Sequence, residues 1–300
     1  MAEAVAEVMA RFIPDGVVIE STAVVAGEDG AEGHAVGPLR VSAYLPVNEE
    51  LEETRRRLEE ALWYLGRIRP LAAPEFRPIE GTDWTAAWKE HYQPIPVGRK
   101  LMIVPAWLEP PWKDRIPIFI DPGMAFGTGA HPSTQLCLEL IEEILETLRV
   151  SKTLRVFDNL EVIDIGCGSG ILSIAALKLG VGHALGVDID EDAIHAAFEN
   201  AERNGVADKL ELGKGSLAEI RGGDFSVRRA DLVTANILAP VIIRLLDEGL
   251  LELLERGGSL VLAGILDEQS AGVEDALKKR GIHRVERRQQ GDWVAFWASI

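Results

Sequence analysis

Asp164-Ile-Gly-Cys-Gly-Ser-Gly170 places three glycines at alternate positions directly after an apolar run. Glycine lets the backbone approach a ligand where a Cβ would obstruct it. The segment from Ile171 is typical of a helix, and the first N–H groups of a helix are free to receive a carboxylate or a phosphate. Asp188 follows about 20 residues later at the end of the next apolar run, where an acid suits the hydroxyls of a ribose. This spacing predicts a site for an adenosine-containing cofactor.

The acid at the head of the glycine loop favours S-adenosylmethionine over NAD. Asp164 would repel the doubly charged pyrophosphate of a dinucleotide, whereas the methyl donor carries a sulfonium, an ammonium and only one carboxylate. Two simpler interpretations stay open: a glycine turn without a ligand, and an Asp188 that only faces solvent near the next helix start. Asp190 directly precedes that helix and is expected to be its N-cap.

A second run of residues that could bind a ligand begins at Asp121 and ends at a predicted helix start. Pro132 suits the first helical position and His131 the N-cap, where we expect it to fix the loop rather than act as a base. The hydroxyls of Ser133 and Thr134 then lie near the positive end of the helix dipole, which suits a carboxylate such as the methionine tail. Self-capping is the alternative for both, and proximity to a glycine loop favours Thr134 as the ligand.

Asn236 ends a predicted strand. An Asn in this position is usually a turn or cap residue, but in a methyl-transfer site its amide oxygen could accept a hydrogen bond from the incoming amine. Phe126 lies among small residues of the earlier run. It is expected to cover the adenine or the methionine chain, with core filling equally open. The sequence contains no convincing general base, so catalysis is expected to depend on positioning.

Alternating strands and helices after residue 100 predict an α/β fold with a doubly wound, mostly parallel sheet. Such sheets bind ligands at the carboxyl ends of their strands, where Asp164, Asp188 and Asn236 would converge. The predicted strands are 101–105, 116–120, 161–165, 183–188, 209–213, 230–236, 257–265, 282–289 and 292–299, the last two as an antiparallel hairpin. The predicted helices are 132–149, 170–179, 190–204, 237–255 and 267–280.

Residues 1–80 are typical of a small α+β domain, and residues 81–300 form the second domain. A proline-rich linker is expected at about 69–82. It precedes a short aromatic helix over 84–92, in which Trp84 and Trp88 share one face and would pack a domain junction. The small domain is predicted to contain helices over 2–12 and 49–66, strands over 16–25 and 39–47, and a last strand over 76–80.

Composition excludes several classes of function. A net charge of −17 over 300 residues argues against direct nucleic-acid binding, which needs a basic surface. The acidity fits a basic protein substrate, although solubility alone would also explain it. No apolar run reaches the roughly 18 residues of a membrane span. The two cysteines, Cys137 and Cys167, lack metal-ligand spacing, so no metal is expected, and with no signal peptide they indicate the cytoplasm.

Three segments together resemble the PrmA family, whose members methylate ribosomal protein L11: the run from Asp121 to Thr134, the glycine loop, and Asn236-Ile-Leu. Within the first, Gly-Thr-Gly-x-His-Pro-x-Thr is highly specific. The resemblance covers about 16–300. It implies a seven-stranded class I methyltransferase sheet and a ferredoxin-like substrate-recognition domain that here lacks its opening strand. Residues 150–160 look like an insertion.

The resemblance also implies a set of functional residues. Asn236 would be the catalytic residue, and the substrates would be lysine and N-terminal amines of L11. Methyltransferases for another protein or a small amine would share these motifs and stay open, as do a binding protein without catalysis and a nicotinamide-dependent oxidoreductase. The S-adenosylmethionine contacts would come from Thr134, Gly166, Asp188 and Asn236, with Phe126, Gly168 and Leu238 beside them.

Overall fold

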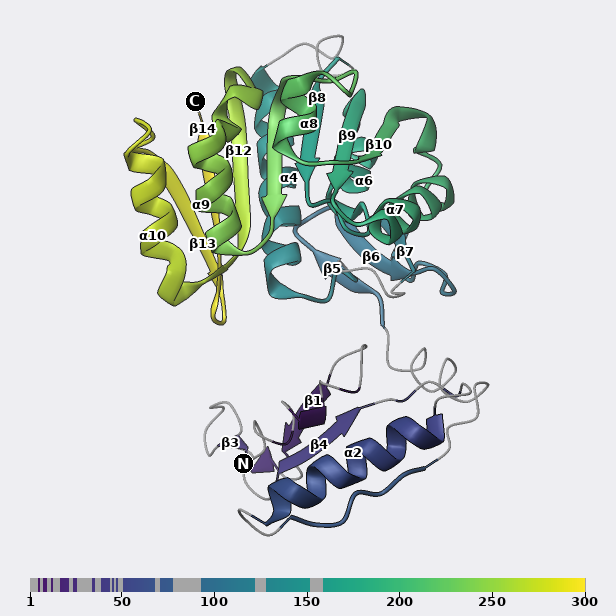
Figure 1. Ribbon diagram of the computed structural model, residues 1–300. Helices are drawn as coiled ribbons and strands as arrows, with labels where there is room; N and C mark the ends of the chain where they lie inside the picture. The colour runs from purple at the N-terminus through teal and green to yellow at the C-terminus, as the bar shows by residue number, and fades with distance from the viewer. Residues whose placement is uncertain are drawn as a thin grey trace. The chain divides into compact units, whose positions relative to one another are not determined.

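The computed structural model describes residues 93–121, 128–151 and 159–299 continuously; in the N-terminal part it describes 51–67, 71–77, 17–21, 24–25, 34–35, 39–43 and single positions at 5, 8, 9, 12, 45 and 47. The chain divides into two compact units, Met1–Trp84 and Thr85–Ile300 (Figure 1). No helix within the described ranges combines the length and the apolar character that a membrane span requires.

In the first unit the strand predicted over 16–25 is divided in two, the strand at 34–35 was not predicted, and the strand over 39–47 and the helix over 49–66 have shorter counterparts. β1 (Val17–Ser21) pairs antiparallel with β4 (Leu39–Ala43), and β2 (Val24–Val25) pairs with β3 (His34–Ala35). Helix α2 (Leu51–Gly66) buries Leu58. The predicted aromatic helix over 84–92 lies outside the described residues, as do most of the predicted helix over 2–12 and strand over 76–80.

A seven-stranded sheet forms the centre of the second unit, in the order β10-β9-β8-β11-β12-β14-β13. The first five strands run parallel, and β14 pairs antiparallel with both β12 and β13. The predicted α/β class with a mostly parallel sheet is confirmed. The strands are β8 (Glu161–Ile165), β9 (His183–Asp188), β10 (Leu210–Lys214), β11 (Ala230–Asn236), β12 (Leu254–Leu266), β13 (Val285–Gln290) and β14 (Trp293–Ser299).

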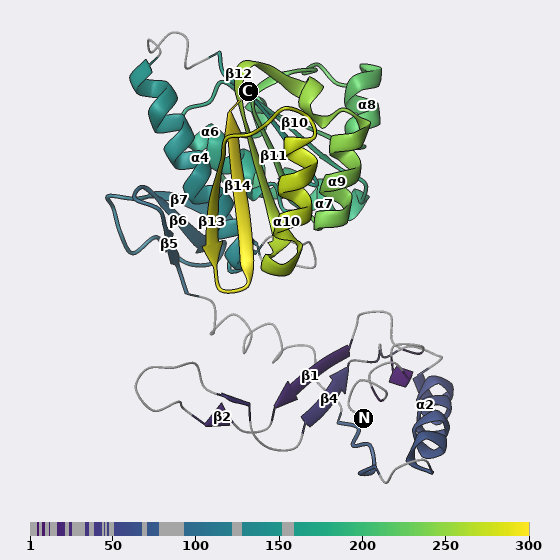
Figure 2. The same cartoon turned by 90° about the vertical axis from the view of Figure 1, so that its left-hand side faces the viewer.

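Helices cover both faces of this sheet, and each face has its own buried apolar cluster. Figure 2 shows α4 and α6 on one side and α8, α9 and α10 on the other. The helices are α4 (Pro132–Ser151), α6 (Ile171–Lys178), α7 (Glu191–Arg203), α8 (Leu217–Gly222), α9 (Ala239–Glu248) and α10 (Asp267–Lys278).

Two helix predictions need correction. The single helix expected over 237–255 ends at Glu248, because Gly249 adopts a left-handed C-cap conformation with φ of 104°. A short 3-10 turn, Leu250–Leu253, follows it. Sequence analysis also missed α8, which begins with a capping box between Ser216 and Glu219.

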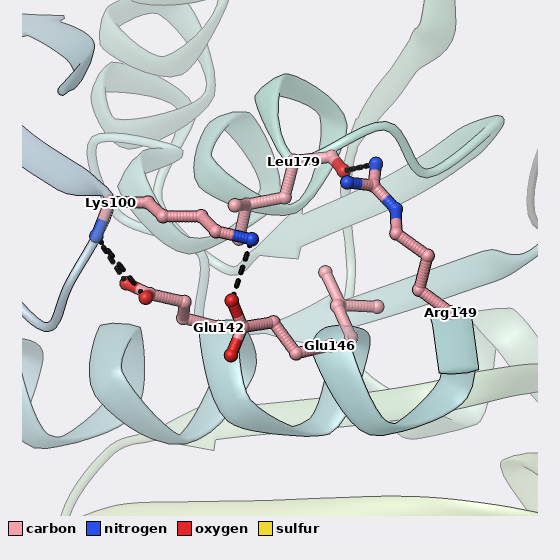
Figure 3. Close-up of a pocket in the computed structure, with 6 residues that line it drawn as sticks. Lys100, Glu142, Glu146, Arg149 and Leu179 are labelled. Atoms are coloured by element: carbon pink, nitrogen blue, oxygen red, sulfur yellow. Dashed lines mark hydrogen bonds and ion pairs between the residues drawn. The ribbon is translucent and has the colours of Figure 1, made fainter. Parts of the chain in front are cut away.

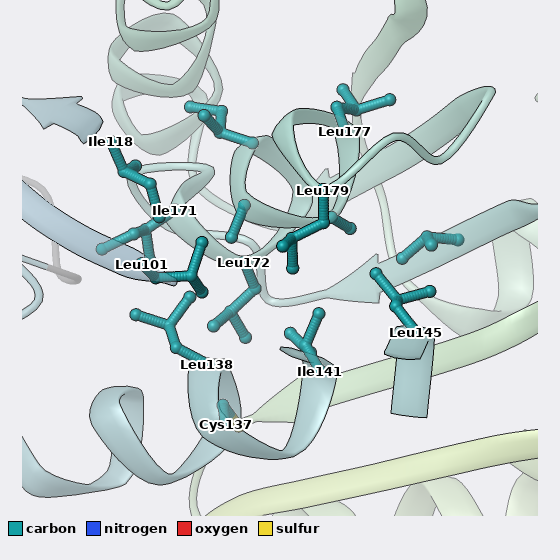
Figure 4. Close-up of a cluster of buried hydrophobic side chains, with 14 of the residues drawn as sticks. Leu101, Ile118, Cys137, Leu138, Ile141, Leu145, Ile171, Leu172, Leu177 and Leu179 are labelled. Atoms are coloured by element: carbon teal, nitrogen blue, oxygen red, sulfur yellow. The ribbon is translucent and has the colours of Figure 1, made fainter. Parts of the chain in front are cut away.

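A small three-stranded sheet packs beside α4 and α6. It consists of β5 (Ile95–Val97), β6 (Leu101–Pro105) and β7 (Ile116–Ile120), of which β6 and β7 run parallel. Figure 4 shows Leu101 and Ile118 of this sheet within the cluster formed by Leu138 and Ile171. The cluster fixes the end of β7, from which the Asp121 run starts.

The chain order of the strands defines where a ligand can bind. From β8 the chain proceeds outward to β9 and β10, and it then returns to β11 on the other side of β8. Ligands of doubly wound sheets bind at such a switch point, outside the carboxyl ends of the strands. The glycine loop follows β8 and Asn236 ends β11, so both lie at this point.

Candidate functional site

The glycine loop turns tightly between β8 and α6. The N–H groups of Gly166 and Cys167 donate to the carbonyl of Val187 at 2.8 and 3.0 Å. Gly166 has a φ of 71°, in the left-handed region where residues with a Cβ are strained. A Cβ there would also lie 2.5 Å from Cγ2 of Ile237. Glycine is therefore required at position 166 by the backbone and by the neighbouring β11–α9 connection.

Asp188 links the end of β9 to this loop. Its Oδ2 accepts a hydrogen bond from the Gly168 N–H at 2.9 Å, and its Oδ1 accepts one from the Asp190 N–H at 3.1 Å. Asp190 is the N-cap of α7 and accepts from the Asp192 N–H, as expected. Asp188 is therefore held against the glycine loop, and Asp190, not Asp188, caps α7.

Thr134 and Asn236 meet on the other side of the switch point. The Nδ2 of Asn236 donates to the Oγ1 of Thr134 at 3.2 Å, and Thr134 is fully buried. The Oδ1 of Asn236 is also buried, and it has no hydrogen-bond partner among the residues that the structure describes. A buried acceptor without a donor is costly. This oxygen therefore marks a place where an N–H or O–H group of a ligand would be stabilised.

His131 fixes the start of α4, in line with the sequence analysis. Its Nδ1 lies 2.7 Å from the Ser133 hydroxyl and accepts from the Ser133 N–H at 3.3 Å. The ring packs edge-on against Trp293 with the centroids 4.3 Å apart, and burial lowers the pKa of His131. The Ser133 hydroxyl is thus engaged locally, which leaves Thr134 as the hydroxyl of this turn that reaches Asn236.

Asp164 requires a correction, because its carboxyl group lies in the core and is not exposed at the head of the glycine loop. It accepts hydrogen bonds from the Thr234 hydroxyl at 2.7 Å and the Ser173 hydroxyl at 3.1 Å, and it is fully buried. Burial raises the pKa of Asp164 to about 6, despite the two hydroxyl groups that lower it. The group ties β8, β11 and α6 together beneath the glycine loop. Sequence analysis missed Thr234 and Ser173. Each is a hydroxyl residue within an apolar run, and that pattern could have indicated a buried hydrogen bond.

The remaining predicted residues lie at the rim of the site or outside the described part. Leu238 is 67 % exposed at the N-cap of α9, two residues after Asn236. Ile189 is 76 % exposed directly after Asp188. The sequence analysis did not single out this exposed apolar residue. Phe126 lies outside the described residues.

A small pocket elsewhere in this unit is structural (Figure 3). Its carboxylates already have partners in the chain. Glu142 accepts from the N–H groups of Arg99 and Lys100 at 3.1 and 3.2 Å, and the Lys100 ammonium lies 2.6 Å from Glu146. These interactions therefore attach the β5–β6 turn to α4. The pocket is lined by Lys100, Glu142, Leu145, Glu146, Arg149 and Leu179.

The family-model match and the curated relatives indicate one family. The family model described as "Ribosomal protein L11 methyltransferase (PrmA)" matches residues 1–299. A ribosomal protein L11 methyltransferase from Chloroflexus aurantiacus is 38% identical, covering 98% of this chain and 92% of that protein. One from Pelotomaculum thermopropionicum is 39% identical, covering 99% and 94%. The crystal structure of a ribosomal protein L11 methylase from Lactobacillus delbrueckii subsp. bulgaricus is 36% identical with a TM-score of 0.58, covering 69% of this chain and 98% of that one.

Proposed function

The chain belongs to the PrmA family of ribosomal protein L11 methyltransferases, and we propose that it methylates lysine side chains and the N-terminal amine of L11. The observation that carries the proposal is the unpartnered, buried Oδ1 of Asn236 at the end of β11. It lies at the switch point of the sheet, where the glycine loop follows the neighbouring strand β8. An acceptor without a donor in this position suits an amine substrate.

The residues present fit S-adenosylmethionine as the methyl donor. Gly166 and Gly168 leave the backbone uncovered, Asp188 offers a fixed carboxylate for a ribose, and Thr134 offers a hydroxyl at a helix start. S-adenosylmethionine, when bound, supplies a methyl group on a positively charged sulfur. We assign its binding to Thr134, Gly166, Asp188 and Asn236, with Phe126, Gly168 and Leu238 beside them.

The chain's own part in the reaction is to receive and orient a neutral amine. A lysine amine has a pKa near 10.4, so its neutral form at pH 7 costs roughly 4.6 kcal/mol. Removal from water lowers that pKa. The Oδ1 of Asn236 would then accept a hydrogen bond from an N–H of the amine. This bond would direct the lone pair of the amine nitrogen toward the methyl group. His131 is engaged by Ser133 and Asp164 is buried, so neither is assigned as a base, and positioning carries the rate.

The first unit is proposed to recognise the protein substrate. Residues 1–80 would act as the recognition domain, joined through the linker at about 69–82 to the catalytic domain over 81–300. The net charge of −17 favours a basic partner over nucleic acid. We also propose that the reaction takes place in the cytoplasm, because the proposed substrate is a ribosomal protein.

Methyl transfer to purified ribosomal proteins tests the proposal. The protein is incubated with labelled S-adenosylmethionine and intact L11, and the modified amines are mapped by mass spectrometry. We expect label on lysine and N-terminal amines of L11 and none on other ribosomal proteins or on small amines. Label on a different protein or a small amine would overturn the substrate assignment. The absence of any transfer, together with no binding of S-adenosylhomocysteine, would overturn the activity.

A further inference from the structure

Asn200 on α7 connects two segments that are far apart in the sequence. Its Nδ2 donates to the carbonyl of Ser169 in the glycine loop at 3.0 Å. Its Oδ1 accepts from the N–H of Asp121 at 3.0 Å, at the head of the run that leads to Thr134. Asn200 is 1 % exposed; its bond to Ser169 is buried, and its bond to Asp121 is partly buried. One side chain thus joins the two loops to which cofactor binding is assigned.

A neighbouring charge pair reinforces this connection. Arg203, one turn further along α7, donates to Oδ1 of Asn200 at 3.1 Å and lies 3.8 Å from the carboxylate of Asp121. The amide oxygen of Asn200 therefore receives two donors while its nitrogen serves the glycine loop. Because the amide is planar and buried, movement of either loop would break a hydrogen bond to it.

We propose that Asn200 is a positioning residue for cofactor binding. Its amide sets the spacing between the glycine loop and the start of the Asp121 run, and its nitrogen and its oxygen are both engaged by groups of the chain. The inference rests on the proposed function, in which Gly166 and Thr134 hold the cofactor. Binding affinity then depends on a residue that is not itself assigned to the cofactor.

Asn204, the C-cap of the same helix, provides a matched control. Its Oδ1 accepts from the Phe119 N–H at 2.9 Å and its Nδ2 donates to the Phe119 carbonyl at 2.7 Å. Asn204 therefore attaches α7 to the end of β7 with the same chemistry. Its Nδ2 also donates to the Asn200 carbonyl at 2.8 Å, and within the described residues its side chain makes no hydrogen bond to the glycine loop. A loss of affinity that follows Asn200 but not Asn204 would depend on the loop.

The experiment compares Asn200→Asp with Asn204→Asp in the full-length protein. Each change keeps the acceptor oxygen and replaces the donating amide nitrogen by a second oxygen. Binding of S-adenosylhomocysteine is measured by calorimetry, and the thermal midpoints show how far each variant is destabilised. We expect Kd to rise at least tenfold in Asn200→Asp and less than twofold in Asn204→Asp. If the aspartates prevent folding, Asn200→Ser and Asn204→Ser provide the same comparison.

Hydrogen exchange without ligand gives a second readout. Amides of residues 166–170 should exchange faster in Asn200→Asp than in the wild type, and at the wild-type rate in Asn204→Asp. Equal Kd values for Asn200→Asp and the wild type, or equal losses in the two variants, would overturn the inference. Absence of binding in the wild type would instead overturn the proposed function, and the exchange comparison would then decide whether Asn200 holds the loop.

Discussion

The carboxamide of Asn236 donates to the buried hydroxyl of Thr134 at 3.2 Å, which leaves its oxygen without a partner in the described part of the chain. The two residues lie 102 positions apart, at the end of β11 and the start of α4. The contact determines how the amide is oriented: one of its two N–H groups is engaged by Thr134, and the oxygen is free to accept from a ligand.

Replacement of Asn236 by Ala should therefore affect the rate more than the affinity. We expect methylation of L11 to slow on the order of 10²-fold, since misplacement of a reacting group by about 1 Å costs that much. S-adenosylhomocysteine should bind with a much smaller loss. Single-turnover kinetics and calorimetry separate the two effects, and equal losses in both would contradict the role given to the oxygen.

Asp188→Ala should weaken cofactor binding, with Asp190→Ala as its control. The first change removes the proposed ribose partner and leaves the Gly168 N–H without its acceptor. We expect at least a tenfold rise in Kd for S-adenosylhomocysteine. The second removes the N-cap of α7 and should cost about 1 kcal/mol of stability with Kd unchanged. Calorimetry and urea unfolding provide the two measurements, and a comparable rise in Kd for both variants would refute the assignment of Asp188.

Gly166→Ala should destabilise the protein more than Gly205→Ala does. The two glycines have nearly the same φ, 71° and 68°, so the backbone strain is similar, about 1–2 kcal/mol. A Cβ at position 205 meets nothing within 4 Å, whereas at position 166 it meets Ile237. Overpacking there should add about 1–3 kcal/mol. Urea unfolding measures the difference, and adding Ile237→Ala to Gly166→Ala should relieve that extra cost. If it does not, the close contact is not its source.

Asp164 should make stability fall as the pH rises. Burial raises its pKa from 3.8 to about 6, so the folded state binds a proton that the unfolded state has lost. This contribution is fully present below the unfolded pKa and disappears as pH rises through about 6. Relative to Asp164→Asn, the wild type should lose about 1 kcal/mol between pH 5 and 7.5. Urea unfolding across this range measures the difference. A constant difference between the two proteins would show that the group is not shifted.

The elements of the second unit could be predicted because long apolar runs end at glycines or acids. The predicted strands over 161–165, 183–188 and 230–236 coincide with β8, β9 and β11. The apolar pattern after α9 continues past Gly249, so periodicity alone could not show that this glycine would end the helix. The six residues of α8 are too few for a periodic signal.

The site could be predicted only as far as the strand ends indicate it. Asp188 and Asn236 follow from their positions, but the direction of Asp164 depends on which strand lies next to β8. Thr234 of β11 is its register partner, and parallel neighbours in register present their side chains on the same face. No local sequence pattern determines the order of strands in the sheet. The hydroxyl groups that bind Asp164 could therefore not be predicted from the sequence.

Burial of the thiols has a practical consequence. Cys167 lies within the glycine loop and Cys137 on α4, and burial raises the pKa of both. Since the thiolate is the reactive form, alkylation of the folded protein should be slow. Cys167 should react only when the loop opens, and Cys137 only when α4 detaches from the core. The ratio of the two labelling rates would then report how often the glycine loop opens relative to α4, and no engineered probe would be needed.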